Sequence, residues 1–123
     1  MTNERTILIT GVTGHQGGAV AQALQGTGFH LRGLTRKPDS PRAAALARQG
    51  IDIVKGDLDD EATLRRALAG AWGVFGVQNA GEAGVEREEA QGKRLATLAR
   101  EAGVEHYVYI RGIGRQPDGR PAL

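Results

Sequence analysis

Residues 5–18 read RTILITGVTGHQGG, a short apolar run followed by glycines at positions 11, 14 and 17. The run at 5–10 is apolar on both parities, which is typical of a strand buried on both faces of a parallel sheet. Glycines after such a strand allow a tight turn, and the free N–H groups of a helix that starts there favour a phosphate. The stretch therefore predicts a strand, a phosphate-binding turn and a helix.

Short β-branched runs alternate with alanine-rich stretches along the rest of the chain. Further strands are expected at 29–34, 51–58, 72–78 and 104–110, and helices at 17–25, 40–50, 59–70 and 85–102. This alternation predicts an α/β fold, a Rossmann-type doubly wound parallel sheet of about five strands in the order 3-2-1-4-5. That order places the ends of the first and fourth strands side by side, and a ligand is expected at this switch point.

The three glycines have separate expected roles at the switch point. Gly11 allows the tight turn, Gly14 lets the backbone approach a pyrophosphate, and Gly17 lets the helix lie close to the strand. The residues between them complete the expected cofactor-binding segment: Thr13, His15 and Gln16. An ordinary turn is the alternative, because a chain with 19 glycines contains chance matches to such a spacing.

The second predicted strand leads into LTRKP, where sites for NAD(H) carry an acidic residue that accepts from the ribose hydroxyls. Arg36 and Lys37 would instead meet a 2′-phosphate with two positive charges, Arg36 as a planar fork and Lys37 as a point charge. The pair favours NADP(H) over NAD(H) as the cofactor. A solvated basic loop is the alternative interpretation.

Residues after the third and fourth strands are the other candidates for nucleotide contact. Asp57, in KGDL, and the adjacent backbone of Leu58 are placed to hold the adenine amine, and a helix cap is the alternative for Asp57. Gln78 and Asn79 lie where a ribose or nicotinamide would run, with turn residues as the alternative. Gly92 interrupts a predicted helix at a cost of about 1 kcal/mol relative to alanine, so a strand or the cofactor is expected to approach it closely.

Composition and charge exclude several classes of function. The 123 residues include no cysteine, and the three histidines lie far apart in the sequence, so we expect no metal site. A net charge of +2, with basic and acidic residues interspersed, argues against direct binding of nucleic acid. No run approaches the roughly 18 apolar residues that span a bilayer, and the N-terminus lacks an apolar signal stretch, so a cytoplasmic location is expected.

Five segments between Thr6 and Tyr109 carry a family pattern: TGVTGHQGGAVAQAL, GLTRKP, GDLDDEATLRRAL, GVFGVQN and EREEAQGKRLATLAREAGVEHYVY. Together they resemble the NmrA-like branch of the atypical short-chain dehydrogenases/reductases. The resemblance implies a Rossmann fold that binds NADP(H), with cofactor contacts at the matching positions Gly11, Gly14, Gly17, Arg36, Asp57, Gln78 and Asn79. Members of the family include NADPH-sensing regulators that bind other proteins, and reductases that act on quinones or related small substrates.

Two departures from the family pattern bear on catalysis. The Tyr-x-x-x-Lys motif of short-chain dehydrogenases is missing, because Arg111 stands four residues after Tyr107. The other tyrosine, Tyr109, is followed by Ile113 at the same spacing. Arginine keeps its proton and does not replace the lysine, so no catalytic residue is expected. The chain also lacks the C-terminal substrate-binding part of the family, which would leave the strand at 104–110 as an edge open to self-association or to a protein partner.

Three functions stay open. In the first, residues 1–110 form an incomplete NAD(P)-binding domain that senses NADPH and passes its state to a regulatory protein partner. In the second, they are the N-terminal fragment of an NAD(P)H-dependent oxidoreductase that acts on a quinone or a similar small substrate. In the third, the remnant of the sheet buries too little surface to fold and binds nothing. The missing catalytic motif favours the first.

Residues 111–123, RGIGRQPDGRPAL, lose the alternation of strand and helix and form an irregular tail unlike the family. A shifted reading frame is one explanation, because a choice of codons for this tail, read one base later, gives GASADSRTGVPH, which is similar to the family at this point. A flexible tail of Gly, Pro and Arg is the other. The gene sequence distinguishes the two, since an early stop codon in the shifted frame excludes the first.

Overall fold

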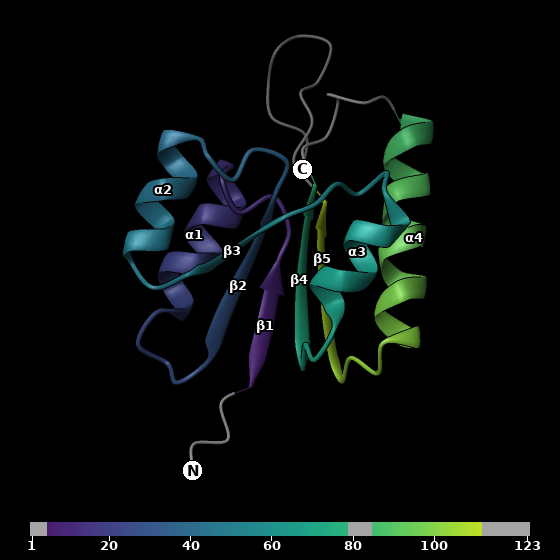
Figure 1. The fold of residues 1–123 in the computed structure, drawn as a ribbon. Coiled ribbons are helices and arrows are strands. Elements are labelled where there is room, and N and C mark those ends of the chain that lie inside the picture. The colour runs from purple at the N-terminus through teal and green to yellow at the C-terminus, as the bar shows by residue number, and fades with distance from the viewer. Residues whose placement is uncertain (1–4, 79–84, 112–123) are drawn as a thin grey trace, which may run out of the picture.

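The computed structural model describes residues 5–78 and 85–111, in which strands and helices alternate (Figure 1). The strands are β1 (Thr6–Ile9), β2 (His30–Thr35), β3 (Asp52–Lys55), β4 (Gly73–Gln78) and β5 (His106–Arg111). The helices are α1 (His15–Leu24), α2 (Pro41–Arg48), α3 (Glu61–Leu68) and α4 (Val85–Glu101). The strands pair in parallel in the order β3-β2-β1-β4-β5, which confirms the predicted Rossmann-type topology.

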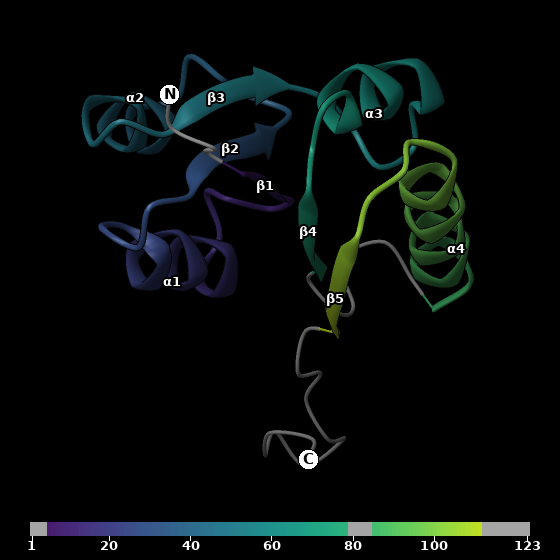
Figure 2. The same ribbon diagram turned by 90° about the horizontal axis from the view of Figure 1, so that it is seen from below.

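Helices cover both faces of the sheet, as Figure 1 and Figure 2 show. The apolar cluster beneath α1 and α2 contains the buried residues Ile7, Ile9, Val12, Ala21, Leu31 and Ile51. The cluster beneath α3 and α4 contains Leu8, Leu34, Leu64, Ala67, Leu68, Ala71, Val74, Leu95, Leu98 and Ala99. Successive residues of β1 thus point into different clusters, which explains why the run at 5–10 is apolar on both parities.

Caps and glycines set the helix boundaries. The Ser40 hydroxyl accepts a hydrogen bond from the Ala43 N–H at 3.2 Å, and Pro41 occupies the first position of α2. Gly50 follows this helix with φ of +94°, a conformation that L side chains rarely adopt. Asp60 caps α3 in the same way as Ser40 caps α2, by accepting from N–H groups of the first turn.

Some element boundaries differ from the prediction. α1 begins at His15 rather than at position 17, because Gly14 already serves as the N-cap. β3 ends at Lys55. The Gly56 N–H still donates to the Thr35 carbonyl oxygen of β2 at 3.0 Å, but the Asp57 N–H donates to the Thr63 hydroxyl of α3 at 3.1 Å. β5 runs through Arg111, the residue at which the irregular tail was expected to begin.

β5 packs closely against α4 where the helix contains Gly92. A Cβ at this position would lie 3.0 Å from the Tyr109 hydroxyl oxygen, so the group that approaches the glycine is a strand residue. Gly76 of β4 leaves space beside it for the rings of Tyr107 and Tyr109. Both tyrosines therefore face α4, and each keeps 37% of its surface exposed. Partial burial, and then the neighbouring Tyr109, raise the pKa of Tyr107 to about 12.

An aromatic cluster lies at the amino ends of the strands. Trp72, directly before β4, stacks on Phe29 with 5.6 Å between ring centroids and contacts His106 at 4.5 Å. The indole Nε1 donates to the Glu105 carboxylate at 2.7 Å, and the Arg5 guanidinium lies 4.8 Å from the ring centroid. This cluster fixes the end of the sheet opposite to the predicted ligand site.

Candidate functional site

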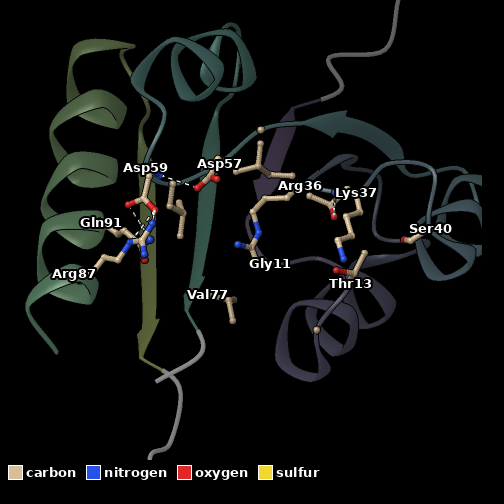
Figure 3. Close-up of a pocket in the computed structure, with 15 residues that line it drawn as sticks. Gly11, Thr13, Arg36, Lys37, Ser40, Asp57, Asp59, Val77, Arg87 and Gln91 are labelled. Atoms are coloured by element: carbon tan, nitrogen blue, oxygen red, sulfur yellow. Dashed lines mark hydrogen bonds and ion pairs between the residues drawn. The ribbon is translucent and has the colours of Figure 1, made fainter. Parts of the chain in front are cut away.

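An open cavity of about 760 Å³ lies at the carboxyl ends of the strands, at the predicted switch point (Figure 3). Its lining comes from the β1–α1 turn, the loops that follow β2 and β3, the end of β4, and α4. The lining residues are Gly11, Thr13, Gly14, Leu34, Thr35, Arg36, Lys37, Ser40, Gly56, Asp57, Leu58, Asp59, Val77, Arg87 and Gln91. The volume falls within the range of small-molecule sites.

The β1–α1 turn is the tightest part of the cavity wall. Gly11 has a φ of +59°, and its carbonyl oxygen accepts from the Gly14 N–H at 2.9 Å. A Cβ at Gly17 would lie 2.1 Å from the Gly11 carbonyl oxygen, so the helix can lie against the turn only with glycine here. Gly14 has an ordinary φ of −84°. Its expected role, close approach of a pyrophosphate, stays a prediction.

α1 presents its amino end at this wall. The N-cap Gly14 has no side chain, so no side-chain hydrogen bond caps the first turn of α1. Uncapped N–H groups and the helix dipole give this end a partial positive charge. Thr13 lines the cavity together with the turn glycines, whereas His15, Gln16 and Gly17 do not.

Two basic side chains form the wall beside α2. Arg36 and Lys37 follow β2, are exposed and line the cavity. In Figure 3 the Lys37 side chain points toward Thr13, and that of Arg36 lies between Asp57 and Gly11. Within residues 5–78 and 85–111 neither cation forms an ion pair, so both charges are available to an anion in the cavity.

The loop between β3 and α3 forms the opposite wall. Asp57 and Leu58 both line the cavity, as the sequence placed them. Asp57 is not the cap of α3, because Asp60 has that role. Its Oδ1 accepts instead from the Asp59 N–H at 2.9 Å, which folds the loop into a compact turn.

α4 reaches this loop with side chains that the sequence analysis did not single out. Asp59 Oδ2 accepts from Arg87 Nε at 3.0 Å and from Arg87 Nη2 at 2.6 Å, and its Oδ1 accepts from Gln91 at 3.0 Å. The hydrogen bond from Arg87, and then that from Gln91, hold the pKa of the Asp59 carboxyl below its usual value. The same bond to Asp59 raises the pKa of Arg87. In the sequence, Arg87 and Gln91 look like any solvated helix face.

At the switch point, the Thr10 side chain bonds β1 to β4. Its hydroxyl donates to the Val77 carbonyl oxygen at 3.0 Å and accepts from the Val77 N–H at 2.8 Å, with the side chain fully buried. The side chain thus continues the pairing of β1 with β4 where the backbone turns away at Gly11. Gln78 ends β4, but its side chain and Asn79 lie outside the described residues.

Within the described ranges, no three His, Asp or Glu side chains gather as a metal site would require. No helix in that part of the chain has the length and apolar character needed to cross a membrane.

Residues 3–114 match the NmrA-like family. The chain belongs to this family. A protein of Aspergillus hancockii named as an NmrA-like family domain-containing oxidoreductase is 38% identical over 113 residues, which cover 88% of this chain and 34% of that protein. The chain spans about a third of the length of the curated relatives it matches.

The solved structures that are similar to this chain include a regulator and an enzyme. NmrA, a negative transcriptional regulator, in complex with NADP, superimposes with a TM-score of 0.76 and 27% identity over 86% of this chain and 33% of that one. The NADPH-dependent quinone oxidoreductase of Escherichia coli, complexed with NADPH, superimposes with a TM-score of 0.72 and 32% identity over 84% of this chain and 35% of that one.

Proposed function

We propose that this chain binds NADP(H) and serves as a nucleotide-sensing module that passes the bound state to a protein partner. The observation that carries the proposal is the arrangement of positive charge in the cavity. The uncapped start of α1 and the side chains of Arg36 and Lys37 face the same space, and neither side chain has an acidic partner among the described residues. Such a surface is complementary to a ligand with two separate phosphate groups.

We assign one part of NADP(H) to each wall. The pyrophosphate would lie at the Gly11–Gly14 turn, where backbone can approach it without a side chain between. The 2′-phosphate would meet Arg36 and Lys37, and the adenine would lie toward Asp57 and Leu58. The bound NADP and NADPH of the two solved relatives support this choice of ligand.

A sensing role needs a nucleotide site and a surface for the partner, but no catalytic tyrosine. Tyr107 and Tyr109 face α4, and neither lines the cavity. Among the described lining residues the acids are Asp57 and Asp59, and the hydrogen bond from Arg87 lowers the pKa of the Asp59 carboxyl.

A reductase is the second candidate. It is favoured by the names of the Aspergillus relative and of the E. coli quinone oxidoreductase. In that case sequence beyond the described residues supplies the substrate wall beside the nicotinamide. Oxidation of NADPH by a simple quinone in the presence of the chain would support this candidate over sensing.

Titration with NADPH and with NADH, followed by nucleotide emission and by calorimetry, tests the proposal. We expect NADPH to bind at least about tenfold tighter than NADH, because charge-assisted bonds to the 2′-phosphate are missing with NADH. The double variant Arg36→Ala/Lys37→Ala should lose this preference and keep its affinity for NADH. Arg48→Ala, which removes an exposed cation of α2 that does not line the cavity, is the matched control. The proposal would be contradicted if the wild type bound both nucleotides with equal affinity, or if a folded chain bound neither nucleotide.

A further inference from the structure

Three side chains of α4 converge on the loop that follows β3. Arg87, Gln91 and Arg94 lie about one turn apart along one face of the helix. Arg87 and Gln91 bind the two oxygens of the Asp59 carboxylate at 2.6–3.0 Å. Arg94 Nη1 donates to the Leu58 carbonyl oxygen at 2.8 Å and lies 3.8 Å from Asp59 Oδ1. We call this group, with Asp59, the Asp59 clasp.

The Asp59 clasp acts on residues that line the cavity. Asp59 has two attachments: its carboxylate is tied to α4, and its backbone N–H holds the Asp57 carboxylate at 2.9 Å. Leu58, between them, is tied to the helix through its carbonyl oxygen. Any shift of Asp59 relative to α4 therefore moves the two residues against which the adenine is expected to lie.

Global folding depends little on the clasp. The Arg87 side chain is 60% exposed, and exposed ion pairs contribute little to stability. The buried residues Leu64, Leu68, Leu95 and Leu98 already hold α3 against α4. The network is thus larger than the packing of the two helices requires, and its members Asp59, Arg87 and Gln91 line the cavity itself.

We infer that Asp59 is a positioning residue for the nucleotide: through Arg87, Gln91 and Arg94 it fixes the β3–α3 loop to α4 and so presets the adenine side of the cavity. The inference rests on the proposed NADP(H) binding. Because adenine is common to NADPH and NADH, the clasp supports both nucleotides equally. In this it differs from Arg36 and Lys37, which distinguish the two.

The test compares the affinities of Asp59→Asn for NADPH and NADH with those of the wild type. We expect both affinities to fall by the same factor, about five- to tenfold, with the NADPH/NADH ratio and the melting temperature unchanged. Glu101→Gln is the matched control, since it breaks another exposed ion pair made by α4, from Arg65 of α3 to Glu101 at 3.0 Å, away from the cavity. Its affinities should equal those of the wild type.

A double-mutant cycle separates the clasp from direct contact by Arg87. If Asp59 acts through Arg87, the double variant Asp59→Asn/Arg87→Gln loses no more affinity than the single variant with the larger loss. Losses that multiply would assign Arg87 to the ligand and overturn the inference. If the wild type binds both nucleotides and Asp59→Asn binds them with the same affinities, the inference is overturned and the proposed function stands. A folded wild type that binds neither nucleotide would overturn both.

Discussion

The two walls of the cavity hold their shape by different means. The β1–α1 turn is fixed by its own backbone, with Gly11 at a φ of +59° and Gly17 so close to it that no Cβ fits. The β3–α3 loop is fixed by side chains that reach it from α4, between 28 and 36 residues further along the chain. One wall is a local feature of the sequence, and the other is a product of the tertiary fold.

The difference has a physical consequence for binding. Steric contact within the turn does not depend on solution conditions, whereas exposed ion pairs weaken as salt rises. The side of the cavity assigned to phosphate is therefore rigid, and the side assigned to adenine responds to its charged neighbours. The wall fixed by side chains is tested by the Asp59 variants described above. The following variants test the wall fixed by its backbone and the strands that support both walls, beginning with the largest expected effect.

Gly17→Ala tests the wall that the backbone fixes. The new Cβ would lie 2.1 Å from the Gly11 carbonyl oxygen, so the helix and the turn must separate. We expect the free energy of unfolding to fall by about 2–3 kcal/mol, measured by urea and thermal unfolding.

Gly18→Ala is the matched control for this variant. A Cβ at Gly18 would lie 3.0 Å from Arg42 Nη2, the far end of a flexible side chain that can move aside. Alanine also has a helix propensity better than that of glycine by about 1 kcal/mol, so stability should be equal to that of the wild type or higher. Similar losses in both variants would show that contact between Gly17 and Gly11 does not fix the turn.

Thr10→Val tests the seam between β1 and β4 that lies beneath both walls. Valine keeps the shape but leaves the N–H and carbonyl groups of Val77 without the bonds at 2.8 and 3.0 Å. We expect a loss of about 1–2 kcal/mol in the free energy of unfolding. Thr10→Ser keeps the hydroxyl and should retain most of the stability, and a serine variant as unstable as valine would contradict this role of the hydroxyl.

Tyr107→Phe has the smallest expected effect on stability. Tyr107 lies on β5, which contacts α4 as the β3–α3 loop does. Burial raises its pKa to about 12, so the folded state disfavours the ionised phenol. The stability that this provides is fully present below the ordinary pKa of about 10 and is lost as the pH rises from there toward the folded value. Tyr107→Phe should lose stability less steeply than the wild type over this range. The free energy of unfolding is measured by urea unfolding at several pH values. If it falls equally steeply with pH in both proteins, the raised pKa of Tyr107 is contradicted.

The sequence predicted the fold and the glycine turn because both depend on local rules. The double apolar parity of 5–10 and the glycine spacing each have a short-range physical cause. The same holds for the basic pair after β2, which lies at the carboxyl end of a strand and hence at the cavity.

The α4 contribution to the site could not be predicted in the same way. Arg87 and Gln91 are polar residues on a helix of many charges, and only the crossing of α4 past the β3–α3 loop gives them a partner. Conversely, His15 and Gln16 were expected at the cofactor because they lie between the glycines. Their side chains belong to the first turn of α1 and do not line the cavity, and their contact with the cofactor stays a prediction.

The position of Trp72 has an optical consequence. It is the single tryptophan of the chain and lies at the amino end of β4, whereas the cavity lies at the carboxyl end. A strand of six residues spans about 20 Å, so a nucleotide in the cavity does not touch the indole ring. Emission from Trp72 before nucleotide is added therefore reports on the integrity of the sheet, while emission from the bound nucleotide reports on the cavity.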